Sequence, residues 1–254
     1  MVHGGPVFAQ RRRGDPVTDT NSHRVALVTG SAGGLGRALV TELERDGWRV
    51  AAATHVDGPF GADLAEPAAA AGLVDRVVEA FGRLDLVVAN HATMTMAPVE
   101  LHPPDDWWRV VDTNLGGSFR LARAAAPHLT HVRGCLVFIS SEWGVTGWPH
   151  ATAYASSKAG LIGLTKALAR ELAPNVRVNA IAPGVVDTPQ LAVDAEDAGV
   201  SLDEIRERYA SSAPLGRIAS AAEIAASVVF LASPGGAYYT GQVLQPNGGT
   251  TMAS

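Results

Sequence analysis

Short aliphatic runs alternate with longer amphipathic stretches from residue 25 onward. Nearly continuous apolar runs of this length are typical of strands that are buried on both faces of a parallel sheet. The runs predict strands at 25–28, 50–53, 84–89, 135–139, 176–181 and 243–244.

The stretches between these runs have the length and apolar spacing of helices, and several begin near Asp or Ser and end near Gly or Pro. They predict helices at 36–46, 68–81, 105–128, 154–173 and 221–231. Regular alternation of strand and helix is typical of an α/β protein with a doubly wound parallel sheet, flanked by helices and joined by right-handed crossovers. We therefore expect a single domain over residues 24–254.

Two segments depart from this alternation. Residues 1–23 hold glycines and prolines around the run Arg11–Arg13 and lack an apolar period, so we predict a disordered tail there. Residues 187–214 are polar, carry acids that include Asp194, Glu196, Asp197 and Asp203, and follow a predicted strand end. In a doubly wound sheet, a segment at that point lies over the ligand crevice, and we expect it to act as a lid.

Composition narrows the classes of function. The 254 residues carry 25 acidic and 20 basic side chains, a net charge of −5, which excludes a generally basic nucleic-acid surface. We find no long apolar segment typical of a membrane span, and none of the kind that follows the arginines of an export signal. Cys135 is the only cysteine, which excludes an intrachain disulfide and favours a reducing compartment, the cytoplasm.

The C-terminal part of the chain carries no charged residue after Glu223. Such a stretch belongs either in the core or at a subunit interface, or it is simply a tail of low charge. The histidines also show no His-x-x-x-His or comparable spacing, so we expect no catalytic metal.

A glycine-rich turn, Thr29-Gly30-Ser31-Ala32-Gly33-Gly34-Leu35-Gly36, joins the first predicted strand to the first helix. Glycines at this point let the backbone approach a pyrophosphate, which the amides and the helix N-terminus then bind. A purely structural turn is the alternative, and the position after the first strand makes it less attractive. No Gly-Lys-Ser/Thr follows, so nucleotide hydrolysis is disfavoured.

Three polar residues are candidates for catalysis. Tyr154 and Lys158 are spaced to share one face of a predicted helix, and Ser141 follows the strand at 135–139. An ammonium about 4 Å from a phenol contributes about 4 kcal/mol at an effective dielectric near 20. That equals about three pKa units, so we expect Lys158 to bring the pKa of Tyr154 toward neutrality. Such a phenol exchanges a proton with an alcohol or ketone while hydride moves to or from a nicotinamide.

With these motifs, the chain resembles the short-chain dehydrogenase/reductase family, in its single-domain type that includes the 3-ketoacyl-carrier-protein reductase-like members. TGSAGGLG is similar to the TGxxxGxG turn, Asn90-His91-Ala92-Thr93 to NNAG, and Tyr154-x-x-x-Lys158 to YxxxK. The match also includes Asn114, Ser141, Pro183, Gly184 and Thr188, in the order of the family and over about residues 24–250.

The resemblance implies a Rossmann fold and an NAD(P)(H)-dependent oxidoreductase that interconverts a secondary alcohol and a ketone. Tyr154 is then the general acid/base, Lys158 binds the nicotinamide ribose, Ser141 orients the substrate and Asn114 supports a proton relay through water. It also implies a homotetramer. The cofactor-binding set that we expect is Gly30, Ser31, Gly34, Leu35, Gly36, Thr54, His55, Asp63, Leu64, Asn90, Ala92, Tyr154, Lys158, Pro183, Gly184, Val186 and Thr188.

The sequence departs from the family in two places. His91 and Thr93 replace the second Asn and the Gly of NNAG, which tightens or shifts the backbone near the ribose. The segment 54–62 is too short for the usual helix, so one crossover is trimmed, although Asp63-Leu64 still resembles the pair that contacts adenine.

The choice of cofactor is read at the end of the second strand, where a carboxylate binds the ribose of NAD and a cation binds the phosphate of NADP. Thr54 and His55 occupy these positions, so neither the carboxylate that favours NAD nor the arginine that favours NADP is present. A protonated His55 favours NADP(H) slightly. Asp57, if it reaches the ribose hydroxyl, favours NAD(H) instead.

Trp143 and Trp148 follow Ser141 and are candidate walls of a substrate pocket, which suits a bulky hydrophobic or cyclic substrate. Two other functions compete with the oxidoreductase. A non-catalytic dinucleotide-binding sensor or structural subunit shares the fold, and its mark is a broken Tyr–Lys pair. A nucleotide-sugar epimerase or dehydratase needs a larger substrate domain than the residues after Lys158 provide.

Overall fold

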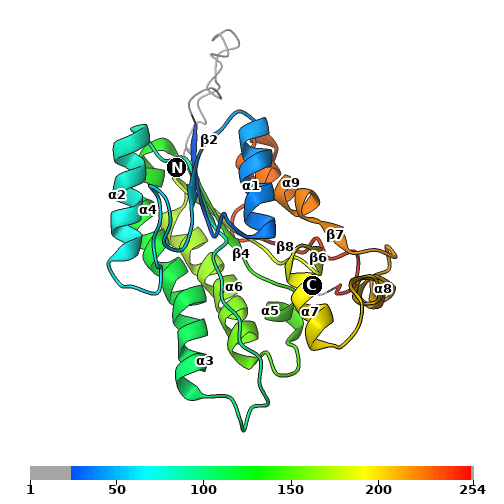
Figure 1. The fold of residues 1–254 in the computed structure, drawn as a ribbon. Coiled ribbons are helices and arrows are strands. Elements are labelled where there is room, and N and C mark those ends of the chain that lie inside the picture. The colour runs from blue at the N-terminus through cyan, green and yellow to red at the C-terminus, as the bar shows by residue number, and fades with distance from the viewer. Residues whose placement is uncertain (1–23, 253–254) are drawn as a thin grey trace, which may run out of the picture.

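A computed structural model describes residues 24–252 of the chain. Its centre is a six-stranded parallel sheet with the order β2-β1-β3-β4-β5-β8 (Figure 1). The strands are β1 (Val25–Thr29), β2 (Arg49–Ala53), β3 (Leu86–Ala89), β4 (Cys135–Ile139), β5 (Arg177–Ile181) and β8 (Val243–Leu244). All of the strands predicted from the aliphatic runs are present, with ends shifted by up to two residues.

Helices cover both faces of the sheet (Figure 1). On one face lie α2 (Ala69–Phe81), α4 (Gly117–Val132) and α6 (Thr152–Leu172), and on the other lie α1 (Gly34–Arg45) and α9 (Ala221–Ala232). Side chains of β1 alternate between the two layers, since Leu27 packs in the first and Val28 in the second, both fully buried. The predicted doubly wound α/β fold is thus confirmed.

The strand order reverses at β1, which pairs with β2 on one side and with β3 on the other. In open α/β sheets, ligands bind at such a reversal, outside the carboxyl ends of the strands. Thr29 ends β1 opposite Ala53 of β2, and Ala89 ends β3 opposite Phe138 of β4. The residues that follow these ends therefore share one crevice.

The crossover from β2 to β3 is trimmed, as the short segment after β2 predicts. Residues 54–68 contain neither helix nor strand, and α2 makes the connection. Because no strand forms in residues 54–68, β2 lies at the edge of the sheet.

The helix predicted at 105–128 begins and ends elsewhere and is interrupted. It consists of α3 (Pro104–Val111), a π-helical turn η2 (Asp112–Gly116) and α4, which continues to Val132. Gly117 lies at the junction, where a Cβ would come within 2.8 Å of the Leu64 carbonyl oxygen. The inserted residue of a π turn shifts the side chains around it, and such turns are frequent at functional sites.

The segment 187–214 is more regular than the sequence predicts. It contains α7 (Gln190–Asp197) and α8 (Leu202–Ser212), between the paired short strands β6 (Val186–Asp187) and β7 (Ala219–Ser220). Leu191 and Ile205 are buried and anchor the two helices, and Ser201 forms a capping box with Glu204. The lid remains a prediction, but its backbone is helical.

Two short elements complete the fold: α5 (Trp143–Thr146) and η3 (Pro234–Gly236). Cys135 is buried and free of a disulfide. Within residues 24–252, no helix has the length and apolar character needed to cross a membrane. The predicted tail, residues 1–23, lies outside the described part of the chain.

Candidate active site

The turn between β1 and α1 brings the backbone close to neighbouring strands. Gly30 has a positive φ of 63°, and a Cβ there would lie 2.9 Å from the Cα atom of His91. A Cβ on Gly36 would overlap the Gly30 carbonyl oxygen. Because neither space accepts a side chain, both glycines are required by the turn itself.

Hydrogen bonds to the ends of two strands hold this turn. Asn90, after β3, donates from Nδ2 to the carbonyl oxygens of Thr29 and Gly30, each at 3.1 Å. Ser31 donates from Oγ to the carbonyl oxygen of Ala53, at the end of β2, at 3.0 Å. The turn is therefore tied to the strands on both sides of it.

The N-terminus of α1 is open to an anion. Its N-cap residue, Gly33, offers no side-chain hydrogen bond, and the first turn contains no acidic residue. The first amides of a helix point along its axis and carry a partial positive charge, so they suit a pyrophosphate. Gly34 lies against Thr188, since a Cβ there would approach the Thr188 side chain to 2.7 Å. The turn thus faces the segment after β5.

The three candidate catalytic residues meet at the carboxyl end of β4. Ser141 follows β4, and it lines the same cavity as Tyr154, which lies on the first turn of α6. Lys158 lies one turn further along α6, with 2% of its surface exposed. Its Nζ donates to the carbonyl oxygen of Ile139 at 2.7 Å and lies 5.4 Å from the centre of the Tyr154 ring.

The electrostatics differ from the sequence-based expectation. Burial raises the pKa of Tyr154 above its ordinary value, and the neighbouring Ser141 hydroxyl opposes this in part. Burial also lowers the pKa of Lys158 to about 8. The expected lowering of the Tyr154 pKa is wrong, because burial is the largest influence on the phenol, and Lys158 Nζ binds the Ile139 carbonyl. The phenol is therefore protonated at neutral pH.

Asn114, in the π-helical turn, is fully buried, and its amide is used by neighbouring groups. It accepts from the Thr93 backbone N–H at 2.8 Å, and Nδ2 donates to the Thr93 carbonyl at 2.9 Å and to Ser157 Oγ at 3.0 Å. Ser157 Oγ in turn donates to the Tyr154 carbonyl at 2.7 Å. Asn114 thus holds the backbone around Tyr154, while its relay role stays a prediction.

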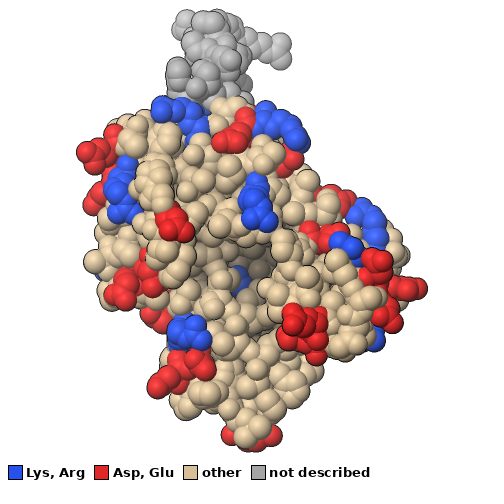
Figure 2. Space-filling view, in the orientation of Figure 1, with Lys and Arg blue, Asp and Glu red and all other residues tan. Residues whose placement is uncertain are grey.

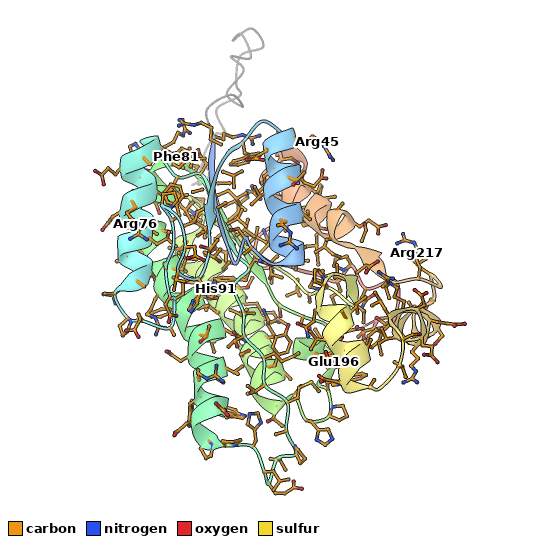
Figure 3. The ribbon with its side chains drawn as sticks, in the orientation of Figure 1. Arg45, Arg76, Phe81, His91, Glu196 and Arg217 are labelled. Carbon is orange, nitrogen blue, oxygen red and sulfur yellow. The ribbon has the colours of Figure 1, made fainter. Side chains whose placement is uncertain are left out.

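His91, which departs from the family pattern, turns its ring into the protein (Figure 3). Its Nδ1 lies 2.8 Å from Thr29 Oγ1, and its Nε2 lies 3.5 Å from Ser118 Oγ. Burial, together with the Lys158 charge, lowers the pKa of His91 to about 3. The ring is therefore neutral and links β1 to α4 beneath the crevice.

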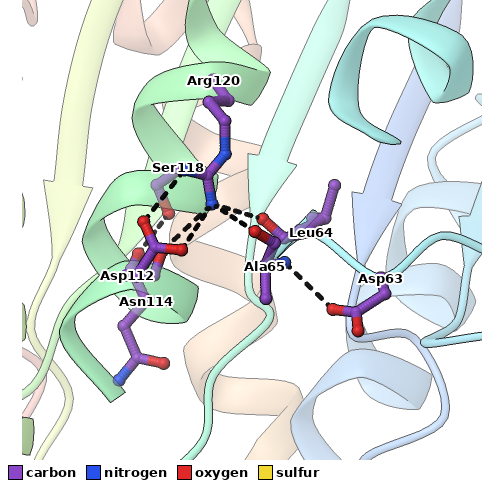
Figure 4. A network of polar contacts seen from close by, with 7 residues as sticks. All are labelled: Asp63, Leu64, Ala65, Asp112, Asn114, Ser118 and Arg120. Atoms are coloured by element: carbon purple, nitrogen blue, oxygen red, sulfur yellow. Dashed lines mark hydrogen bonds and ion pairs between the residues drawn. The ribbon is translucent and has the colours of Figure 1, made fainter. Parts of the chain in front are cut away.

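Arg120 connects the predicted adenine segment to the helix that carries Asn114 (Figure 4). Its guanidinium donates to the Leu64 carbonyl at 2.8 Å, to the Ala65 carbonyl at 3.1 Å and to the Asp112 carboxylate at 2.9 Å. Asp63 accepts from the Ala65 N–H at 3.0 Å, which orders the same loop. No motif in the sequence indicates Arg120, because the carbonyls that it binds are more than fifty residues away.

Thr54 and His55, the residues that follow β2, each contact another residue of the loop after that strand. The Thr54 hydroxyl donates to the Asp57 carbonyl oxygen, and His55 Nδ1 lies 3.8 Å from an Asp63 carboxylate oxygen. The side chain of His55 is 71% exposed. It therefore has a carboxylate beside it before any phosphate binds, and Asp57 uses its backbone rather than its side chain in this contact.

A cavity of about 520 Å³ opens at the carboxyl ends of β3, β4 and β5. Figure 2 shows this hollow near the middle of the molecule, with the blue of a basic side chain at its floor. Twelve of the predicted site residues line it: Leu35, Asn90, Ala92, Ser141, Trp143, Trp148, Tyr154, Lys158, Pro183, Gly184, Val186 and Thr188. The remaining predicted residues, Gly30, Ser31, Gly34, Gly36, Thr54, His55, Asp63, Leu64 and Asn114, lie outside its lining.

The sequence did not indicate many of the residues that line the cavity. These include Met94, Met96, Glu142, Leu191, Asp194, Asp197, Ile205 and Tyr209. The methionines follow β3 without a motif, and the others on α7 and α8 come from the segment expected to be irregular. Only the position of that segment after a strand end indicated that it would contact the crevice.

Comparisons with known proteins agree with this geometry. A family model described as Enoyl-(Acyl carrier protein) reductase matches residues 49–251. The chain belongs to the short-chain dehydrogenase/reductase family. It is 35% identical to the 3-oxoacyl-(acyl-carrier-protein) reductase FabG of Thermotoga maritima over 90% of this chain and 98% of the relative. The FabG of Pseudomonas aeruginosa is 37% identical, over 91% and 98%.

Solved structures of other family members share the fold. Thermoplasma acidophilum aldohexose dehydrogenase superposes with a TM-score of 0.88 at 28% identity, over 92% of this chain and 96% of that one. A Brucella melitensis short-chain dehydrogenase/reductase, described as a glucose/ribitol dehydrogenase, gives 0.83 at 28%, over 91% and 98%. The predicted family is therefore confirmed, and this short-chain dehydrogenase/reductase is an oxidoreductase that uses a nicotinamide dinucleotide.

Proposed function

We propose that the protein reduces a ketone to a secondary alcohol, with Tyr154 as the proton donor. The observation that carries this is that Ser141, Tyr154 and Lys158 line one cavity, with Lys158 Nζ beside the Tyr154 ring. A protonated phenol acts as the acid in reduction, and burial keeps the Tyr154 phenol protonated. Alcohol oxidation by the same residues requires that phenol to lose its proton first.

The residues present fit a nicotinamide dinucleotide. The open N-terminus of α1 and the Gly30–Gly36 turn suit its pyrophosphate, while Asn90, Ala92, Gly184 and Thr188 line the path to Tyr154. When bound, the reduced cofactor supplies a hydride to the carbonyl carbon. Asp63 and Leu64, outside the cavity lining, are the residues that we expect to contact the adenine.

Each catalytic side chain has a defined task in this proposal. Ser141 donates a hydrogen bond to the substrate carbonyl oxygen, which fixes that oxygen beside the Tyr154 hydroxyl. Tyr154 then gives its proton to the oxygen as negative charge develops on it. Lys158 lies beside the Tyr154 ring and binds the nicotinamide ribose in this proposal. Asn114 holds Thr93 and Ser157 and so positions Tyr154.

NADP(H) is the cofactor that we propose, over NAD(H). No carboxylate occupies the end of β2, where Thr54 and His55 stand, and a protonated His55 pairs with a 2′-phosphate. The nearby Asp63 carboxylate repels a phosphate, so we expect the preference to be small.

We further propose a cytoplasmic homotetramer. The uncharged C-terminal stretch carries exposed aromatic side chains, among them Phe230, Tyr238 and Tyr239. Apolar surface of this kind is typical of subunit contacts. A single buried thiol, Cys135, fits a reducing compartment. Size-exclusion chromatography with light scattering tests the subunit number.

The experiment that tests the function has two parts. Nicotinamide fluorescence is followed while purified protein is titrated with NADPH and with NADH, and then oxidation of the bound dinucleotide is followed with a panel of ketones. We expect saturable binding, tighter for NADPH, and turnover with at least one ketone. Binding without turnover on a broad panel of ketones and alcohols supports the non-catalytic sensor, and no binding of either dinucleotide contradicts the proposal.

A further inference from the structure

The outer part of the cavity has an aromatic wall that the reaction does not require. Trp143 stacks on Trp148 with their rings 5.0 Å apart and 5° from parallel. Trp143 also meets the Tyr154 ring edge-on, at 5.9 Å and 83°. The three rings therefore form a continuous series that begins at the catalytic phenol and ends at the cavity mouth, where Trp148 is 48% exposed.

Other residues that line the cavity are also apolar. Met94 and Met96 come from the loop after β3, and Leu191 and Ile205 come from α7 and α8. Methionine side chains are flexible and polarizable, and their sulfur atoms make favourable contacts with aromatic rings. A flat ring stacked on the exposed indole of Trp148 would therefore gain contacts with an aromatic face and with a deformable apolar lining.

The charges on the lining disfavour a negatively charged substrate. Lys158 is the only Lys or Arg side chain among the lining residues, and it lies at the floor beside Tyr154. Nearer the lid, Asp194 and Asp197 line the cavity, and none of the ion pairs found among residues 24–252 includes either of them. Figure 2 shows acidic side chains beside the opening, and Glu196 lies on the same helix (Figure 3). A phosphate or carboxylate on the outer part of a substrate would meet like charge.

From these observations we propose that the substrate is a flat, ring-containing ketone without negative charge, whose ring lies against Trp148 while its carbonyl meets Tyr154. This inference rests on the proposed ketone reduction. It separates this chain from relatives whose names specify acyl-carrier-protein substrates. Trp148 is then the residue that sets selectivity between ring and acyclic ketones.

The test compares three ketones with the reduced dinucleotide that binds more tightly. 2-Tetralone is a neutral fused ring, ethyl acetoacetate is neutral and acyclic, and acetoacetyl-CoA is acyclic and anionic. We expect kcat/KM for 2-tetralone to exceed that for ethyl acetoacetate by about tenfold or more, and acetoacetyl-CoA to be the poorest of the three. An aromatic stack of ordinary strength accounts for a factor of about three to ten in KM.

Variants show whether Trp148 carries the preference. Trp148→Leu should lower the ratio of kcat/KM for 2-tetralone over ethyl acetoacetate by about three- to tenfold, mainly through KM of the ring substrate. Trp108→Leu is the matched control, because Trp108 is also exposed, at 63%, and also packs on a neighbouring indole, but lies outside the cavity. It should leave the ratio unchanged.

The outcomes separate the inference from the function. Preference for acetoacetyl-CoA, or a Trp148→Leu ratio equal to that of the unaltered protein, overturns the ring-ketone inference while leaving ketone reduction in place. Absence of turnover with all three ketones and with a wider panel overturns the proposed function, and the inference with it.

Discussion

The neutral His91 ring makes the stability of the protein depend on pH in a defined way. In the folded protein burial lowers the pKa of His91 to about 3, against an ordinary value of 6.5. The unfolded chain therefore binds a proton at mildly acidic pH that the folded protein cannot accept. The contribution to stability is fully present above pH 6.5 and is lost as the pH falls from there toward 3.

The size of this effect follows from the two pKa values. Between the unfolded and folded pKa, each pH unit removes up to about 1.4 kcal/mol from the free energy of unfolding. From pH 7 to pH 5 the unfolded chain goes from mostly neutral to almost fully protonated at this position, while the folded ring stays neutral. The expected loss is therefore about 2 kcal/mol over this interval.

The assay is urea unfolding at pH 7 and pH 5 of the unaltered protein and of His91→Asn, at equal protein concentration. Asparagine cannot take up a proton, so the variant should be less stable at pH 7 but lose about 2 kcal/mol less on acidification. His131→Asn, at an exposed position of α4, is the matched control and should lose as much as the unaltered protein. Equal losses for the unaltered protein and His91→Asn would refute the reasoning.

Two further predictions concern the cofactor and the substrate. Arg120→Met removes charged hydrogen bonds to the Leu64 and Ala65 carbonyls, so the free energy of unfolding should fall by about 2–3 kcal/mol and the Kd for NADPH should rise several-fold. Arg45→Met, which removes an exposed ion pair, should change stability by less than about 1 kcal/mol and leave that Kd unaltered, and equal effects of the two would contradict the bridging role. Ser141→Ala removes the hydroxyl that orients the carbonyl, and kcat/KM should fall by about 100-fold at unchanged cofactor affinity. Steady-state kinetics that show a loss of less than tenfold would remove Ser141 from the mechanism.

The sheet could be predicted from the sequence because its strands are buried on both faces. Runs such as Cys135–Ile139 are continuously apolar, and a run this short between helical stretches is typical of a buried parallel strand. The glycine turn was readable for a similar reason, since Gly30 and Gly36 occupy positions where a side chain does not fit. Local physical constraints of this kind leave a direct mark on the sequence.

Features that depend on contacts between distant segments could not be predicted from the sequence. The π-helical turn at Asp112–Gly116 forms where α4 approaches Leu64 closely, and the sequence around it shows only ordinary helical spacing. The helices α7 and α8 are anchored by few buried side chains, such as Leu191 and Ile205, so their apolar period is weak. For the same reason Asp194 and Tyr209 were missed at the cavity.

The charge relation between Lys158 and Tyr154 is a third case. Spacing on a helix places the two side chains on one face, but it does not say which atoms meet. In the structure Lys158 Nζ binds the Ile139 carbonyl, and burial of the phenol decides the direction in which the Tyr154 pKa moves. The identity of the pair was therefore predictable, and its electrostatics were not.

The most direct test of the account is the kinetic comparison of Tyr154→Phe with the unaltered protein. The substitution removes only the hydroxyl that we propose as the proton donor and keeps the ring that packs on Trp143. We predict that Tyr154→Phe binds NADPH with a Kd within about threefold of the unaltered protein and loses about 1,000-fold or more in kcat for ketone reduction. Retention of more than a tenth of the kcat by Tyr154→Phe would contradict the central claim.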